Sequence, residues 1–282
     1  MADTVAVSFE VYPPRTPEKL PELHDSIRGL DSVDPEFISV TFGAGGSSTR
    51  DSLDVLTFIR ENTTARPLAH LTCVGTTRRE ASELISSFVG QGIREFLALR
   101  GDLPAGEVAH QGELHHASDL VELMKEGLEC SDDIERIAVA AFPNGHPESE
   151  SLHEDIETLL AKQHAGATLA ITQLFFFSED YVRFVDKAKK AGVTIPILPG
   201  LMPITSPGRL ARVLELSGEK EPLALSLELQ STDDPQEWKA IGIEWCATMM
   251  RELIDAGAPG IHLYAFNQHD TVLSALRQAG IR

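Results

Sequence analysis

The sequence predicts an α/β fold in which eight strands alternate with helices. Short runs of β-branched and other apolar residues recur along the chain, and each is followed by a stretch whose apolar residues have helical spacing. Most of these runs start roughly 25 to 40 residues apart, the length of one strand, one helix and their loops. The predicted strands are Val5–Val11, Phe37–Phe42, Pro67–Cys73, Glu95–Arg100, Ile137–Phe142, Leu169–Phe176, Ile195–Leu201 and Ile261–Phe266.

This repeat favours a closed parallel barrel over an open sheet. In a (β/α)8 barrel, or TIM barrel, the strands are buried on both faces and are almost wholly apolar. A doubly wound open sheet is the alternative that the repeat leaves open. No Gly/Ser-rich linker or change of composition divides the chain, so residues 1–282 are predicted to form a single barrel domain.

The predicted helices begin at residues that commonly cap helix N-termini, namely Thr16, Thr76–Thr77 and Ser178. The gap between the seventh and eighth strands is longer than the others. It holds Ser206–Leu216, Leu223–Leu229 and a predicted helix from about Pro235 to Asp255. We therefore predict an insertion around residues 217–256, between the seventh and eighth strands.

Composition and charge exclude several classes of function. With 24 Lys and Arg against 43 Asp and Glu, the net charge is −19, which disfavours binding to nucleic acid or anionic lipid. No apolar run approaches the roughly 20 residues that span a bilayer. Cys73, Cys130 and Cys246 lie far apart, which indicates a reducing compartment and no metal site. The N-terminal residues do not form a secretion signal, so we expect a cytoplasmic protein.

Polar residues gather where the predicted strands end. In a barrel, these carboxyl ends and the loops beyond them form the active site. The positions are Glu10, Thr41, His70, Arg100–Gly101–Asp102, Phe142 with His146, Gln173, and Tyr264 with Asn267. A closed barrel brings all of them to one rim.

Glu10 is a candidate general acid. It lies in an apolar strand, where burial raises the pKa of a carboxyl group. A raised pKa suits a group that donates a proton at neutral pH. A structural salt bridge with Arg15 or another base at the rim is the alternative explanation.

Three other motifs are also candidate ligand contacts. Gly101 allows a ligand to approach the backbone, with Arg100 suited to a phosphate and Asp102 to a cation, but these two charges could instead pair with each other. The glycine-rich turn at 42–48 matches neither phosphate-binding fingerprint and is either a contact with a cofactor or a plain turn between a strand and a helix. Gln173 needs hydrogen-bond partners if it is buried, and the edge of a heterocycle would supply them.

Seven segments together resemble the methylenetetrahydrofolate reductase family, in its bacterial single-domain form. In chain order they are Phe9–Arg15, Ser39–Ala44, His70–Cys73, Ala98–Pro104, Ala117–Leu120, His146–Glu148 and Ile171–Phe176. The resemblance implies a barrel that holds FAD and uses NADH or NADPH to reduce 5,10-methylenetetrahydrofolate to 5-methyltetrahydrofolate, in one-carbon metabolism and methionine biosynthesis. It also implies a homo-oligomer, and it does not decide between the two nicotinamides.

The resemblance implies roles for individual residues. Glu10 would be the general acid that opens the methylene bridge, and Asp102 would stabilise the resulting iminium cation. Gln173 would orient folate and nicotinamide in turn, while Arg209 and Gln268 would meet the folate tail. The positions that align with FAD contacts are Thr41, Phe42, Ala44, His70, Arg100, Gly101, Asp102, His116, Ala117, Phe142, His146, Asp155 and Lys162.

The chain departs from the family pattern near the cofactor and at the tail site. Phe142, Val213, Thr158 and Ala161 stand where relatives carry a tyrosine, a phenylalanine and two polar or basic residues. Gln268 replaces an arginine and Arg209 replaces a glutamine, so we expect Arg209 to compensate for Gln268. These differences concern FAD affinity and tail recognition rather than the reaction class.

Two alternatives keep part of this interpretation. In one, hydride passes directly from the nicotinamide to the folate without a flavin. In the other, the chain is a non-catalytic subunit that binds folate or flavin. Glu10 and Asp102 together favour the enzyme.

Overall fold

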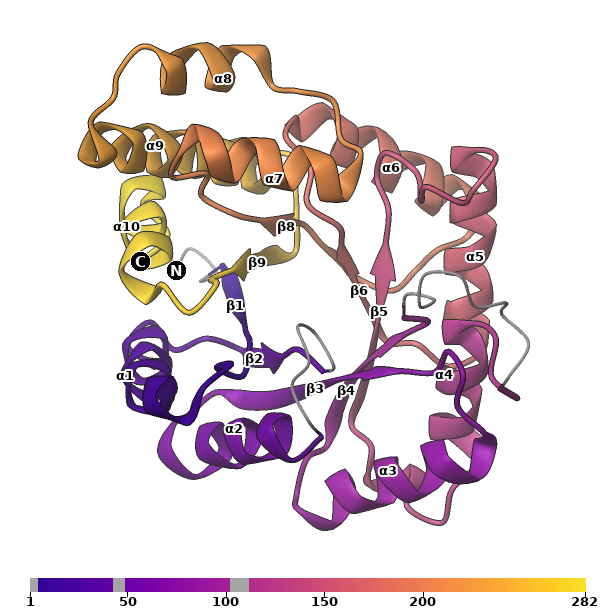
Figure 1. The fold of residues 1–282 in the computed structure, drawn as a ribbon. Coiled ribbons are helices and arrows are strands. Elements are labelled where there is room, and N and C mark those ends of the chain that lie inside the picture. Colours follow the sequence, from indigo (N-terminus) through magenta and orange to yellow (C-terminus); the bar gives the residue numbers. More distant parts are fainter. Residues whose placement is uncertain (1–4, 43–48, 102–111) are drawn as a thin grey trace.

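The computed structural model describes residues 5–42, 49–101 and 112–282. Its described strands form one parallel sheet in the order β7-β6-β5-β4-β3-β2-β1-β9-β8. Figure 1 shows the strands at the centre, with the helices around them. The strands are β1 (Ala6–Val11), β2 (Phe37–Val40), β3 (Arg66–Thr72), β4 (Glu95–Leu99), β5 (Arg136–Ala141), β6 (Leu169–Thr172), β7 (Ile197–Leu198), β8 (Gly200–Leu201) and β9 (Gly260–Tyr264).

The sheet closes into a barrel at its seventh strand position, which β7 and β8 share. β7 pairs with β6, whereas β8 pairs with β9. Pro199 separates the two halves, and its carbonyl accepts a hydrogen bond from the backbone N–H of His262 at 3.0 Å. One predicted strand therefore passes from one neighbour to the other. The eight predicted strands and the TIM-barrel fold are confirmed, and the open sheet is wrong.

Helices follow the strands and surround the barrel. They are α1 (Leu20–Asp31), α2 (Thr49–Asn62), α3 (Arg78–Gly90), α4 (Ala117–Glu126), α5 (Leu152–His164), α6 (Ser178–Ala191), α7 (Pro207–Ser217), α8 (Leu223–Gln230), α9 (Pro235–Asp255) and α10 (His269–Ala279). The last gap holds α7, α8 and α9, and in Figure 1 α8 lies at the periphery beside α7 and α9.

The predicted caps have different outcomes. Thr77 caps α3 and accepts a hydrogen bond from the Glu80 N–H at 3.2 Å, as predicted. Thr16 precedes the short 3₁₀ helix Pro17–Lys19 but makes no side-chain cap. The prediction for Ser178 is wrong, because the helix begins at this residue and its hydroxyl donates to Glu252 at 2.7 Å instead.

Alternation along the strands divides the core into two layers. Side chains such as Phe9, Val40 and Leu71 belong to the large apolar cluster that also contains helix residues. A smaller apolar cluster takes one or two residues from successive strands, as expected for a barrel interior: Phe37, Leu68, Leu97, Ala138, Leu169, Ile171 and Leu198. Further along the strands, the positions that face the same way hold polar residues. These residues supply the groups of a candidate active site at the carboxyl end.

Arginines and glutamates close the amino end of the barrel. Glu95, the first residue of β4, is 2% exposed and pairs with Arg66 at 3.0 Å and Arg136 at 3.4 Å. Glu36 pairs with the same two arginines. The Arg136 guanidinium also lies over the Phe37 ring, 5.2 Å from its centroid. In the described parts of the chain, no helix has the length and apolarity needed to cross a membrane.

Candidate active site at the carboxyl end of the barrel

Glu10 lies near the carboxyl end of β1, beside two imidazoles. Its Oε2 is 3.5 Å from His70 Nε2 and 4.0 Å from His262 Nε2. The Glu10 side chain is 20% exposed, whereas both histidines are buried. The three groups come from β1, β3 and β9, which the order of strands in the sheet brings together. No ion pair of Glu10 with Arg15 or another arginine occurs among the described residues.

The environment of Glu10 changes its protonation in the direction opposite to our expectation. Burial raises the pKa of the carboxyl group, but His70 and His262 together outweigh that effect and hold the pKa below its ordinary value. The predicted raised pKa is therefore wrong. Burial also lowers the pKa of His70, against the attraction of Glu10, which favours the neutral imidazole. Glu10 is thus a carboxylate at neutral pH.

His262 continues this contact toward the barrel interior. Its Nδ1 lies 2.9 Å from the Ser8 hydroxyl, and Ser8 and His262 are direct partners in the β1–β9 pairing. The His262 ring meets the Tyr264 ring edge to face, with centroids 5.3 Å apart. The contact with Ser8 therefore orients the His262 ring so that its other nitrogen, Nε2, faces Glu10 at 4.0 Å.

Tyr264 reaches across the barrel to the sixth strand. Its hydroxyl donates to the Thr172 carbonyl oxygen at 2.7 Å. Gly200 provides the space, since a Cβ there would lie 2.8 Å from the tyrosine ring and 2.4 Å from the Thr172 oxygen. Because residue 200 is a glycine, the Tyr264 side chain of the site can pack directly against the strand that closes the barrel.

Several residues with expected FAD contacts lie together around the β5–α5 loop. The Asp155 carboxylate accepts hydrogen bonds from the His146 N–H at 3.2 Å and the Ser149 hydroxyl at 2.8 Å. Lys162 Nζ donates to the Ala140 carbonyl at 2.9 Å, and burial lowers the lysine pKa to about 8, with Asp155 opposing the shift. Phe142 meets the His146 ring edge to face at 4.8 Å.

Arg100 joins this group through an acid that the sequence did not suggest. Its guanidinium pairs with Glu148, with Nη2 2.9 Å from Oε1. Gly101 follows with a φ of 87°, and a Cβ there would lie 2.9 Å from Thr72 Cβ. A glycine is therefore required where the chain leaves β4.

The other expected cofactor positions lie at neighbouring strand ends. The Thr41 backbone N–H donates to the Val11 carbonyl at 3.1 Å, and its buried hydroxyl has no hydrogen-bond partner among the described residues. Phe42 is half-buried and follows it. His116 is exposed and precedes α4, whose first residue, Ala117, is buried. Ala44 and Asp102 lie outside the described residues.

The expected substrate-binding residues are more exposed. Gln173 follows β6, and its Oε1 accepts a hydrogen bond from the Leu174 N–H at 2.8 Å. Arg209 lies in the first turn of α7, with its guanidinium carbon 5.4 Å from the centroid of the Phe266 ring. Gln268 precedes α10 and is exposed.

Our sequence interpretation missed His262 and Ser8. Both could have been found from alternation, because His262 precedes Tyr264 by two residues and Ser8 precedes Glu10 by two. Residues two apart on a strand share a face. A polar residue two positions before each candidate would have indicated a second polar layer.

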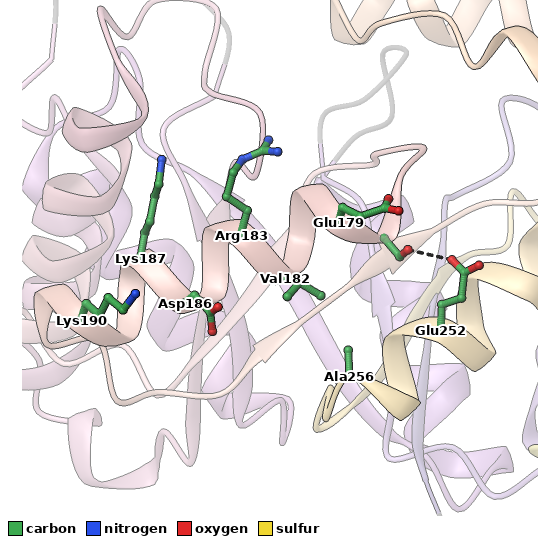
Figure 2. A pocket seen from close by; sticks show the side chains of 9 residues that line it. Glu179, Val182, Arg183, Asp186, Lys187, Lys190, Glu252 and Ala256 are labelled. Atoms are coloured by element: carbon green, nitrogen blue, oxygen red, sulfur yellow. Dashed lines mark hydrogen bonds between the residues drawn. The ribbon is translucent and has the colours of Figure 1, made fainter.

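A surface groove between α6 and α9 lies apart from these residues. It has a volume of about 500 Å³ and is lined by Ser178, Glu179, Val182, Arg183, Asp186, Lys187, Lys190, Glu252 and Ala256. Figure 2 shows these side chains on the two helices, with the Ser178–Glu252 hydrogen bond between them. None of the expected site residues lines it. In the residues described by the structure, no cluster of three or more His, Cys, Asp or Glu side chains could hold a metal ion.

The fold and the site define a (β/α)8 barrel with an acid–imidazole centre at the carboxyl ends of its strands, where barrel enzymes have their active sites. Comparison with protein families then gives the particular family. The methylenetetrahydrofolate reductase model matches residues 1–280. The chain belongs to the methylenetetrahydrofolate reductase family, which confirms the resemblance.

Individual relatives agree with this assignment. The 5,10-methylenetetrahydrofolate reductase of Salmonella typhimurium is 35% identical over 279 residues, which cover 99% of this chain and 92% of that protein. The reductase of Escherichia coli is 34% identical with the same coverage. A solved protein from Clostridium thermocellum that binds two copies of 5-methyl-5,6,7,8-tetrahydrofolic acid has a TM-score of 0.67 and 14% identity, covering 98% of this chain and 94% of that one. This last similarity concerns the fold alone.

Proposed function

We propose that the protein reduces 5,10-methylenetetrahydrofolate to 5-methyltetrahydrofolate, with electrons from NADH or NADPH passed through FAD. The observation that carries the proposal is Glu10 at the barrel rim, in contact with two imidazoles, in a chain of this family. The bridging carbon of the substrate becomes an electrophile only after a ring nitrogen is protonated. Glu10 is the acid suited to that step.

Proton supply to Glu10 follows from the two effects that act on its pKa. In the free site the imidazoles keep it ionised. A folate that covers the rim removes the remaining water from its 20% exposed side chain, which raises the pKa. Glu10 therefore takes up a proton as substrate binds. Glu10 is therefore able to donate a proton only when the substrate is bound.

Residues around the β5–α5 loop, together with Thr41 after β2, fit FAD. Asp155 has one buried oxygen without a hydrogen-bond partner among the described residues, and the Thr41 hydroxyl is in the same condition. These two atoms suit hydroxyl and amide groups, and Lys162 suits the diphosphate. Bound FAD would supply the hydride carrier between the nicotinamide and the folate. Arg100 already pairs with Glu148, so it contributes less net charge than an unpaired arginine.

Asp102 and Gln173 complete the proposal on the substrate side. An anion close to the iminium cation stabilises the charge that develops after ring opening, and Asp102 is assigned this role. We expect Asp102→Asn to slow folate reduction about tenfold and nicotinamide oxidation much less. Single-turnover kinetics of the two steps would measure this, and an unchanged folate rate would remove Asp102 from the mechanism.

The decisive experiment uses the purified protein with its natural cofactor content. We expect visible flavin absorbance that NADH bleaches and that methylenetetrahydrofolate or menadione restores. A colourless protein that oxidises NADH only with folate present would instead support direct hydride transfer. A protein that binds folate or flavin without turnover would support the non-catalytic subunit. A homo-oligomer and a cytoplasmic location remain predictions.

A further inference from the structure

A tight turn gives the β5–α5 loop its shape. Residues 142–145 read Phe-Pro-Asn-Gly, with proline and glycine at the positions that a type I turn favours. The Gly145 N–H donates to the Phe142 carbonyl at 3.2 Å, and Gly145 has a φ of 96°. Phe142 and His146, two of the expected FAD contacts, flank the turn. Asn144 lies within it and is exposed, so the contacts of its side chain decide where the loop is held.

The Asn144 side chain joins three segments of the chain. Its Nδ2 donates one hydrogen bond to Asp180 Oδ2 at 2.9 Å and another to Glu219 Oε2 at 2.8 Å. Asp180 lies in the first turn of α6, and Glu219 lies in the linker between α7 and α8. Both N–H bonds of the amide are thus used, one for each carboxylate. We call these two hydrogen bonds the Asn144 bridge.

A neutral donor suits this position because two acids meet there. Arg183 Nη2 pairs with Asp180 Oδ1 at 2.7 Å and donates to Asn144 Oδ1 at 3.4 Å. Burial, the largest effect, keeps the pKa of Glu219 above its ordinary value, and Asp180 adds to that shift, whereas Asn144 and Lys220 oppose it. A third carboxylate in place of the amide would repel both acids.

The backbone of Glu219 is fixed to the end of α7. Gly218 ends this helix with a left-handed φ of 68°. The Glu219 N–H then donates to the Ser217 hydroxyl at 3.2 Å, and that hydroxyl donates to the Val213 carbonyl at 2.8 Å. The first turn of the same helix holds Arg209, an expected folate contact. The Asn144 bridge therefore connects the loop of expected FAD contacts with the helix of an expected substrate contact.

We propose that Asn144 is a positioning residue that couples FAD retention to the position of α7, by holding the β5–α5 loop against Glu219. The proposal rests on the proposed function, since it requires Phe142 and His146 to contact FAD. Asn144 acts through the turn, because a shift of the turn moves both flanking residues. The sequence did not suggest this role, since the two acids lie 36 and 75 residues further along the chain.

Asn144→Asp tests the bridge with a side chain of the same shape. It replaces both donors with a carboxylate that faces Asp180 and Glu219, so the loop should be released at neutral pH. We expect FAD to leave the holoenzyme about tenfold faster than in the wild type, because two hydrogen bonds at an exposed site are lost. FAD fluorescence after dilution measures the rate. Asn62→Asp, the same change at an exposed asparagine that ends α2, should keep the wild-type rate.

The pH dependence separates positioning from a general loss of structure. The charged groups around Glu219 among the described residues are Asp180 and Arg183 from α6 and Lys220 from the linker. Because its pKa is raised, Glu219 gains a proton readily as the pH falls, and it can then donate to the new carboxylate of Asn144→Asp. The ratio of the variant's FAD release rate to the wild-type rate should therefore fall toward one between about pH 8 and about pH 5.5.

Glu219→Ala tests the connection to α7. It removes only the branch of the Asn144 bridge that reaches the linker, and Glu219 is not an expected FAD contact. We expect about threefold faster FAD release and an about threefold higher folate KM, with kcat unchanged, because one exposed hydrogen bond is lost. Glu215→Ala is the control, since Glu215 pairs with Arg212 on the exposed face of the same helix. It should match the wild type in both measurements.

Specific outcomes would overturn the proposal. Wild-type FAD release in Asn144→Asp would remove the bridge from FAD retention, and an equal rate ratio at both pH values would reduce Asn144 to a purely structural role. Unchanged FAD release in Glu219→Ala would leave α7 uncoupled from the loop. Thermal unfolding checks that each variant is folded. In all three cases the wild type still holds FAD and reduces folate. A wild type that holds no flavin would instead contradict the proposed function itself.

Discussion

Two glutamates, one at each end of the barrel, have different environments. Glu95 at the amino end is 2% exposed and contacts two arginines, and yet burial, the largest effect, keeps its pKa above the ordinary value. Glu36 and Glu135 add to that shift. Glu10 at the carboxyl end is 20% exposed and contacts two imidazoles, which hold its pKa below the ordinary value.

The two glutamates differ in whether the side chains beside them can release a proton. Arginine stays charged at any pH that a protein survives, so Glu95 belongs to a fixed set of charges that closes the barrel. Histidine, in contrast, can be neutral or charged, so the partners of Glu10 do not impose a fixed charge on it. The acid beside arginine is therefore structural here, and the acid beside histidine is suited to chemistry.

The largest expected effect comes from neutralising the carboxylate at the carboxyl end. Glu10→Gln should slow folate reduction about 1,000-fold, the usual scale of general acid catalysis, and leave flavin reduction by NADH nearly unchanged. Stopped-flow absorbance measures the two half-reactions separately. Equal losses in both would contradict the role of Glu10 and erase the contrast with Glu95.

The matching change at the amino end should affect stability instead. Glu95→Ala leaves two arginines facing only Glu36, and we expect a loss of about 3 kcal/mol in the free energy of unfolding. The folate rate per folded molecule should not change. Urea unfolding gives the first quantity and steady-state kinetics the second. A stable variant with impaired folate reduction would show that the two ends are not separate in role.

The pH dependence of binding sharpens the comparison. Covering Glu10 with folate removes its water and raises its pKa from a lowered starting value. The complex should therefore take up close to one proton per site between the two pKa values, and folate reduction should slow as the pH rises through the higher one. Calorimetry in buffers of different ionisation enthalpy measures the uptake. The same uptake in Glu10→Gln would assign the proton to another group.

At the amino end, the pKa of Glu95 is shifted in the opposite direction to that of Glu10, so its effect on stability has the opposite dependence on pH. Because its folded-state pKa is raised, Glu95 binds a proton more readily in the folded protein than in the unfolded chain. Its contribution to stability therefore decreases as the pH rises from the ordinary pKa through the folded-state value.

The smallest expected effect concerns Ser8. Ser8→Ala removes the hydroxyl 2.9 Å from His262 Nδ1 and should slow folate reduction about fivefold, the worth of one hydrogen bond of about 1 kcal/mol. The pH profile of that step should shift with it, whereas NADH oxidation with menadione should not. Identical pH profiles for the variant and the wild type would leave His262 as a packing residue.

Much of the fold could be predicted because barrel strands repeat a local pattern. The eighth predicted strand, Ile261–Phe266, agrees with β9 within two residues at its C-terminal end. The division of the seventh strand at Pro199 could not be predicted, because it depends on which neighbour each half meets. The Ser178 cap failed for a similar reason, since its hydroxyl found a tertiary partner in Glu252.

The candidate site could be predicted in part. Glu10 and His70 were identified from strand ends, and the structure brings them into contact. The direction of the Glu10 pKa could not be read from the sequence, because it depends on distances to His70 and His262 across three strands. The pairing of Arg100 with Glu148 is also a product of loop geometry. Local sequence patterns locate such residues, but the distances that determine their charge interactions exist only in the folded protein.

The division of the seventh strand has a consequence for the motions of the barrel. Each half is held to its neighbour by only two residue pairs, and Pro199 has no amide hydrogen to contribute. Backbone amides of β7 and β8 should exchange with deuterated solvent sooner than those of β3 and β4, because short ladders open at a lower free-energy cost. The divided strand lies beside Tyr264 and His262, so the part of the barrel expected to open most readily also contains part of the candidate active site.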